Sequence, residues 1–323
     1  MKKNGYQTTL SLSGTQVLKA IAILGVLLIH TLSSVQPSPF VNGSQFQLLV
    51  VTLDQLSRIC VPLFVALSGY GLFWKYSQEK LSLKQFFKQR ISKTLPLYVL
   101  WSAIFALLFY FVPTWDSATL QPNFIWKLIL GRADYHLYFV PMIFQLYLLF
   151  PLLLNTFKKN PHLTFITAVL IQLIWWWFFS YQGLTVSSWK YFAGDGEQYI
   201  WCTNWIAYFV LGMYLPRIWQ FFDSRALVFR SSVVLVILFA VLVILSSQNA
   251  IQTGLDPLYA LKFTRYPLLI YSVLGVSVLS YFVAKKTTSN QQKNALLLYI
   301  GKISYPLYLG HTFFLRIIFN FLR

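Results

Sequence analysis

The sequence predicts an all-α polytopic integral membrane protein, with about nine or ten transmembrane helices around a polar cavity. Hydrophobic residues make up 57% of the 323 residues, charged residues only 11%, and the mean hydropathy is +0.60. A water-soluble domain of this length carries far more charge, whereas a lipid-embedded chain does not. Lysines and arginines fall between the apolar stretches, as topology determinants do. The net charge of +18 therefore gives no reason to expect nucleic-acid binding.

Nine apolar stretches are the expected transmembrane helices. The first ends before Pro37 and Pro39, which indicate a helix stop and a short loop. The second is longer than a bilayer requires, and its Pro62 and Gly69 can kink or unwind it. A tenth span is possible if the loop 248–262 or the last stretch contains a break. In chain order, the expected spans are 15–35, 46–75, 95–112, 136–157, 163–180, 200–215, 233–245, 266–284 and 295–321.

The loops predict the orientation of the chain in the membrane. The segment after the second span is the most basic of the chain and holds Lys75, Lys80, Lys84, Lys88, Arg90 and Lys93. With the N-terminus in the cytoplasm, the inner loops together hold many more Lys and Arg residues than the outer loops. We therefore expect a cytoplasmic N-terminus and one transmembrane domain over residues 1–323, with no appended soluble domain.

Lys19 and His30 place two ionisable side chains in the first apolar span. Eleven residues separate them, so at about 100° and 1.5 Å per residue they share a helix face roughly 16 Å apart. Ionisable groups in a span usually face a bundle interior and mark function. A neutral imidazole suits a general base for a hydroxyl at neutral pH, so His30 and Lys19 are candidate catalytic residues. The alternative is that Lys19 snorkels to the interface and His30 caps a neighbouring helix.

Asp54 is the third candidate catalytic residue. It enters the second span from the side at which His30 leaves the first, and its carboxylate is placed to orient the imidazole ring. The competing interpretation is an intrahelical ion pair with Arg58, four residues later.

The basic segment also offers a docking site for a phosphorylated cytosolic donor. Arg90 and Lys93, with Lys88 beside them, lie at the mouth of the third span. The alternative is that these charges act only as topology determinants.

Four further polar residues are candidate acceptor-binding residues: Ser68, Tyr70, His136 and His311. Ser68 can instead satisfy backbone groups, because no G-x-S-x-G elbow surrounds it. His136 can be an interfacial cap near Asp134, and His311 a satisfied interior histidine. No metal-ligand spacing is present, and Cys60 and Cys202 form no disulfide framework, so we expect no metal.

Four stretches together resemble the membrane-bound acyltransferase family 3. They are the Lys19-x10-His30 spacing, VPLFVALSGYGLF at 61–73, HLYFVPMIFQLYLLFP at 136–151 and GKISYPLYLGHTFF at 301–314. The resemblance implies a bacterial plasma-membrane O-acyltransferase. Such an enzyme moves an acyl group, commonly acetyl, from cytoplasmic acyl-CoA to a hydroxyl of a cell-surface or lipid-linked carbohydrate.

The same resemblance assigns roles to particular residues. The first-span cation of the family corresponds to Lys19 and its essential histidine to His30. The Arg-x-x-Arg motif linked to donor binding reads Arg90-Ile-Ser-Lys93 here, so the second position keeps its charge and loses the guanidinium fork. The acyl-CoA is a co-substrate, and direct transfer and a transient acyl-enzyme both remain open.

Two other classes compete with the enzyme. A transporter or flippase for a lipid-linked saccharide would use Lys19, His30 and the second span to bind and gate its substrate without bond making. It would be indicated by an inverted repeat or by a second broken helix in a matching position, and we find neither in the sequence. A signalling or scaffold protein would carry long extramembrane segments, which are absent.

Overall fold

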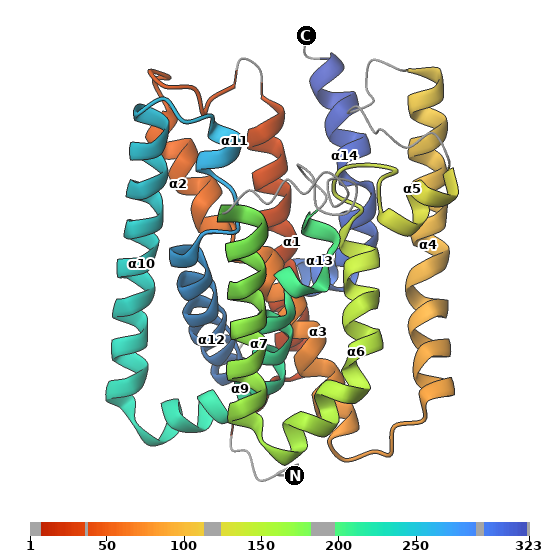
Figure 1. The fold of residues 1–323 in the computed structure, drawn as a ribbon, viewed down its shortest axis with the longest axis vertical. Helices are drawn as coiled ribbons and strands as arrows, with labels where there is room; N and C mark the ends of the chain where they lie inside the picture. The colour runs from red at the N-terminus through yellow and green to blue at the C-terminus, as the bar shows by residue number, and fades with distance from the viewer. Residues whose placement is uncertain (1–7, 36–37, 113–123, 182–197, 289–293, 322–323) are drawn as a thin grey trace. The chain divides into compact units, whose positions relative to one another are not determined.

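A computed structural model describes residues 8–35, 38–112, 124–181, 198–288 and 294–321. The basic residues Lys2 and Lys3 lie outside this part of the chain. Every regular element among the described residues is a helix, and none of these residues is in a strand (Figure 1). The chain is therefore an all-α polytopic membrane protein, as the sequence predicts.

Long apolar helices occupy the predicted spans. Within the described residues, seven segments are long and apolar enough to cross a membrane. They are α1 (Leu12–Ser34), α2 (Gln47–Ser57) with α3 (Cys60–Tyr76), α4 (Leu83–Phe111), α6 (Phe139–Lys159), α7 (Pro161–Trp176) with η3 (Trp177–Tyr181), α10 (Ala226–Gln252) and α12 (Tyr266–Thr288). The other two predicted spans are helical as well, as α9 (Ile206–Ser224) and α14 (Ser304–Phe321).

Shorter helices connect the long ones. They are α5 (Phe124–Leu130), η4 (Gln198–Ile200), η5 (Cys202–Asn204), α11 (Pro257–Ala260) and α13 (Ala295–Lys302). The last predicted span does contain a break, because α13 ends and α14 begins on either side of Ile303.

The second span breaks at a different place from the one we predicted. Pro62 and Gly69 lie inside the continuous helix α3, and the interruption falls at Arg58 and Ile59, between α2 and α3. Pro62 is the third residue of α3, where a missing backbone N–H costs no helical hydrogen bond, so the proline is compatible with a helix start.

Gly69 serves the packing of α3 on α9 instead. A Cβ on Gly69 would overlap the backbone carbonyl oxygen of Phe209, and a Cβ on Gly212 would overlap that of Ala66. Such reciprocal small residues let helix backbones approach closely inside a membrane.

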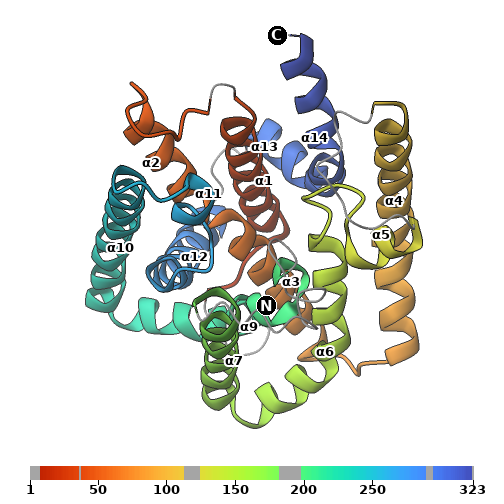
Figure 2. The ribbon, with the colours of Figure 1, turned by 45° about the horizontal axis from the view of Figure 1, so that its top comes forward.

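The chain forms two compact units. The first comprises residues Met1–Leu72, Tyr208–Tyr308 and Phe319–Arg323, and the second comprises Phe73–Ala207 and Leu309–Ile318. In the first unit, α1 packs along α13 and α10 packs along α12 (Figures 1 and 2).

Aromatic side chains fill much of the second unit. Phe86 on α4 stacks on Phe150 of α6 at 5.6 Å between ring centroids, and its edge meets Tyr76 at 5.7 Å. Trp101 on α4 lies against Phe313 and leaves no room for a side chain at Gly310 of α14.

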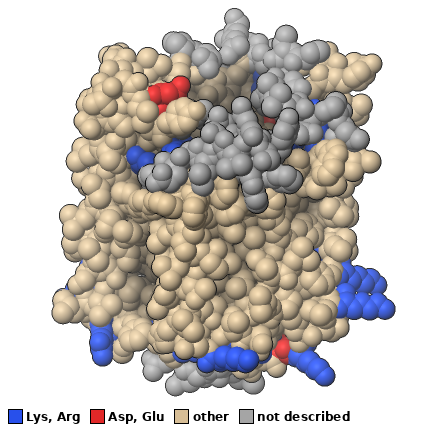
Figure 3. Space-filling model, in the orientation of Figure 1, with Lys and Arg blue, Asp and Glu red and all other residues tan. Residues whose placement is uncertain are grey.

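The outward surfaces suit a lipid environment, and a broad part of the face drawn in Figure 3 carries no charged side chain.

Candidate functional site

Helix α1 carries the first two candidate catalytic residues. Its N-terminus is capped by Ser11, whose side chain accepts a hydrogen bond from the backbone N–H of Gly14 at 3.0 Å. The helix is continuous from Leu12 to Ser34, so the eleven-residue spacing of Lys19 and His30 holds as predicted. The two side chains therefore share one helix face, roughly 16 Å apart along the axis.

This face of α1 is directed into the protein. At about 100° per residue, Lys19 and His30 fall between Val26 and Ile23 around the helix, and both of these apolar residues are fully buried. Lys19 and His30 themselves are only half-buried. An ionisable pair among buried residues, with part of its surface still accessible, is the arrangement expected of side chains that line a polar path.

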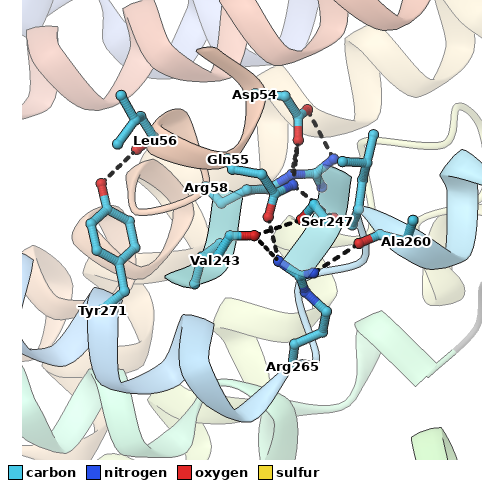
Figure 4. Close-up of polar contacts among 10 residues, drawn as sticks. Asp54, Gln55, Leu56, Arg58, Val243, Ser247, Ala260, Arg265 and Tyr271 are labelled. Atoms are coloured by element: carbon cyan, nitrogen blue, oxygen red, sulfur yellow. Dashed lines mark hydrogen bonds and ion pairs between the residues drawn. The ribbon is translucent and has the colours of Figure 1, made fainter. Parts of the chain in front are cut away.

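Asp54 lies in a buried polar network of the first unit (Figure 4). Its carboxylate accepts hydrogen bonds from Arg58 Nε at 2.9 Å and Nη2 at 3.0 Å, so the pair with Arg58 weighed from the sequence is present, with Arg58 just after the end of α2. Gln55 Nε2 donates to the same carboxylate at 2.7 Å. The role of Asp54 in orienting the His30 ring stays a prediction.

Gln55 connects this pair to a second arginine. Its Oε1 accepts from Arg265 Nη2 at 2.7 Å, while Arg265 also donates to the carbonyl oxygens of Ala260 at 3.0 Å and Val243 at 3.3 Å (Figure 4). The network thereby joins α2 to α10, α11 and the residue that precedes α12. It contains two guanidinium groups and one carboxylate, so these charged groups sum to a positive charge.

Arg90 has a distinctive environment at the start of α4, in the second unit. Its guanidinium carbon lies 5.7 Å from the ring centroid of Phe86 and 5.8 Å from that of Tyr147. Its Nε is buried and has no hydrogen-bond partner among the described residues. A cation that packs on two adjacent aromatic rings and has an unused donor is suited to bind an anion.

The two lysines of the predicted donor site differ in position. Lys93 is exposed and lies about 60° from Arg90 around α4, whereas Lys88 is exposed and lies about 160° away. Arg90 and Lys93 therefore share a side of the helix, and Lys88 points to another.

His136 lies in a buried cluster of the second unit. Its Nδ1 is 3.3 Å from Asp134 Oδ2 and 3.4 Å from the hydroxyl of Thr312, and its Nε2 is 3.1 Å from the carbonyl oxygen of Leu309. Because a carbonyl oxygen only accepts, Nε2 carries a proton and donates. Both ring nitrogens thus face protein atoms, and the ring lies edge-on to His311 at 4.7 Å between centroids.

Asp134 is the centre of this cluster. Arg316 binds its carboxylate with two hydrogen bonds of 2.7 Å, Thr312 donates at 2.6 Å and the backbone N–H of Tyr135 at 2.8 Å. Burial alone would raise the pKa of this carboxyl, but the hydrogen bonds and charges of Arg316 and His136 outweigh it and lower the pKa below its ordinary value.

We did not anticipate Arg316 and Thr312 from the sequence. A lone arginine in the last apolar stretch was the available signal, because charges inside such segments are usually paired. Its partner is 182 residues earlier in the chain, so the pairing itself could not be read from spacing.

The remaining acceptor-binding candidates are divided between the units. Tyr70 is buried in the first unit, where its hydroxyl accepts from the backbone N–H of Leu10 at 3.0 Å and its ring lies 5.5 Å from Trp219. Ser68 is half-buried on the same helix. His311 is buried in the second unit beside His136. A contact of any of them with an acceptor stays a prediction.

The described residues contain no group of three His, Cys, Asp or Glu side chains able to hold a metal ion. The two free cysteines, Cys60 and Cys202, are not bonded to each other.

The fold and the charged face of α1 define a polytopic helical membrane protein with ionisable groups directed inward. Comparison with known families identifies it further, because residues 13–323 match the family model described as an acyltransferase domain. The chain is a member of acyltransferase family 3. No curated protein and no solved structure matches it.

Proposed function

We propose that this membrane acyltransferase moves an acyl group, most simply acetyl, from cytoplasmic acyl-CoA to a hydroxyl of a cell-surface or lipid-linked carbohydrate. The observation that carries the proposal is the placement of Lys19 and His30 on the inward face of α1, in a chain of the acyltransferase family. A base in the outer half of a span and a cation in its inner half suit a reaction whose substrates arrive from opposite sides.

His30 is the proposed general base. The imidazole takes the proton from the acceptor hydroxyl as the hydroxyl oxygen attacks the thioester carbonyl carbon. The new ester C–O bond forms, the C–S bond breaks, and the thiolate of coenzyme A leaves with the proton returned from the imidazolium. In a variant of this mechanism a transient acyl-enzyme precedes transfer. Lys19 assists by holding the donor through its charge.

Arg90 is the proposed anchor for the donor nucleotide, with Lys93 beside it. The buried, unused Nε of Arg90 and its aromatic neighbours support a role in binding a phosphate or the adenine ring. Lys88 lies on a different side of α4, so its contribution is long-range attraction. Ser68, His136 and His311 are the proposed acceptor-side residues, His136 through positioning. Tyr70 is not among them, because its hydroxyl bonds the backbone of Leu10 just before α1, at the end of the helix that faces the cytoplasm in the proposed orientation.

We place the protein in a bacterial plasma membrane with its N-terminus in the cytoplasm. The basic segment 75–93 supports this orientation, because positive loops remain inside. Arg90 and Lys93 then meet acyl-CoA in the compartment where it is made, and His30 lies nearer the outer surface.

The test is a transfer assay with the whole chain in lipid nanodiscs. Purified protein is incubated with acetyl-CoA labelled in the acetyl group and with a cell-envelope glycan fraction. Release of coenzyme A with label in the glycan supports the proposal. If the donor neither binds nor turns over, the proposal fails and the result favours a transporter. The next experiment would then measure movement of a glycan lipid across vesicle membranes.

A further inference from the structure

Gln16 extends the polar face of α1 toward the N-terminus of the helix. It lies one turn before Lys19, about 60° from it and about 40° from His30 around the axis. The three side chains thus form a polar stripe, Gln16–Lys19–His30, that runs roughly 21 Å along the helix. The proposed mechanism uses His30 as the base and Lys19 as the cation, and it assigns no role to Gln16.

The side-chain oxygen of Gln16 is buried without a hydrogen bond. Its Oε1 has no partner among the described residues. Buried polar atoms almost always have hydrogen-bond partners, because burying an acceptor removes its bonds to water and an unpaired acceptor forms no bond to replace them. An unpaired amide oxygen on the same helix face as Lys19 and His30 is therefore a candidate ligand contact.

The backbone of Gln16 is held in place by α13. A Cβ on Gly301 would overlap the backbone carbonyl oxygen of Gln16, so this glycine lets the two helices meet closely at that level. Two residues earlier, a Cβ on Gly14 would press on the side chain of Thr287 from α12. Packing from two helices fixes the position from which the amide extends, which is the condition for a specific hydrogen bond.

We propose that Gln16 binds the pantetheine arm of the acyl-CoA donor, a step that rests on the proposed function. The arm contains two secondary amides, and each offers one N–H to a carbonyl-type acceptor such as Oε1 of Gln16. In the proposed mechanism the thioester approaches His30 from the cytoplasmic end of α1, where Gln16 lies. Gln16 then orients the arm, Lys19 holds it further along, and His30 acts at its end.

The experiment compares two nucleotide probes on variants of the whole chain in nanodiscs. Acetyl-CoA carries the arm, whereas adenosine 3′,5′-bisphosphate carries the nucleotide end and lacks it. Gln16→Leu removes the acceptor, and Gln16→Met does the same with an unbranched side chain if the leucine variant does not fold. Gln248→Leu on α10 is the matched control, because Oε1 of Gln248 is also buried and unpaired among the described residues.

We expect Gln16→Leu to weaken acetyl-CoA binding roughly three- to tenfold, the value of one neutral hydrogen bond, and to leave the bisphosphate affinity unchanged. Gln248→Leu should leave both affinities unchanged. Unchanged acetyl-CoA binding in Gln16→Leu, or an equal loss for both probes, would overturn the role of Gln16 while the proposed function stands. A wild-type protein that binds no acetyl-CoA would instead overturn the proposed function, and this inference with it.

Discussion

The carboxylate of Asp134 and the guanidinium of Arg316 form a bidentate ion pair, with both N–O distances at 2.7 Å. Asp134 precedes α6 and is fully buried, and Arg316 lies on α14 with 17% of its side chain exposed. Because Thr312 and the backbone of Tyr135 also donate to this carboxylate, the contact fixes the turn before α6 onto the last helix.

Asp134→Asn should destabilise the protein strongly. The substitution leaves the Arg316 cation buried without its counter-charge, and breaking such a pair costs about 3–5 kcal/mol. Thermal unfolding in detergent, followed by aggregation or tryptophan fluorescence, measures the change. Glu79→Gln is the control, because Glu79 is exposed, and it should have little effect. Equal unfolding temperatures for wild type and Asp134→Asn would contradict the structural role of the pair.

The same pair predicts how stability depends on pH. The pKa of Asp134 in the folded protein is lower than its ordinary value, so its carboxylate stabilises the fold above about pH 4. This contribution is lost as the pH falls toward the lower, folded-state pKa. The difference in unfolding temperature between wild type and Asp134→Asn should therefore be constant from pH 7 to 5 and shrink below pH 4. A difference in unfolding temperature that grows on acidification would mean that the pKa of Asp134 is raised in the folded protein and not lowered.

The sequence predicts most of the fold and only part of the candidate site. The Lys19 and His30 face is predictable because both residues lie on one helix, whose geometry fixes their relation. The pairing of Asp134 with Arg316 was not predicted, because it depends on packing between segments far apart in the chain. The break in the second span was misplaced at Pro62 and Gly69, since sequence does not distinguish a helix-start proline from a kink, or a packing glycine from a hinge.

Two glycines of α3 test this packing assignment directly. Gly69→Ala places a methyl group against the carbonyl of Phe209 and should cost about 1–3 kcal/mol. Gly71 is exposed and has no atom within 4 Å of the position of a Cβ, so Gly71→Ala should be neutral or gain about 0.5–1 kcal/mol. Unfolding temperatures of the two variants measure the contrast. Similar values for both would mean that α3 and α9 do not meet at Gly69.

Arg90 and Lys88 separate a specific donor contact from general attraction. Arg90→Glu removes a charge-assisted contact worth about 1.5–3 kcal/mol, so acetyl-CoA affinity should fall about tenfold or more. Lys88→Glu makes the same charge change on another side of α4 and should act only at low salt. Titration of acetyl-CoA at two ionic strengths measures both. Equal losses that vanish together in salt would indicate that the segment acts through its charge alone.

The proposed mechanism depends on His30 removing the proton from the acceptor hydroxyl. The most direct test is labelled acetyl transfer by His30→Ala and wild type, reconstituted in nanodiscs at equal amounts, with acetyl-CoA binding measured on the same samples. We expect His30→Ala to insert, fold and bind acetyl-CoA as wild type does, while glycan labelling and the accompanying release of coenzyme A fall at least about a hundredfold. Transfer at the wild-type rate by a folded His30→Ala protein would contradict the assignment of the base.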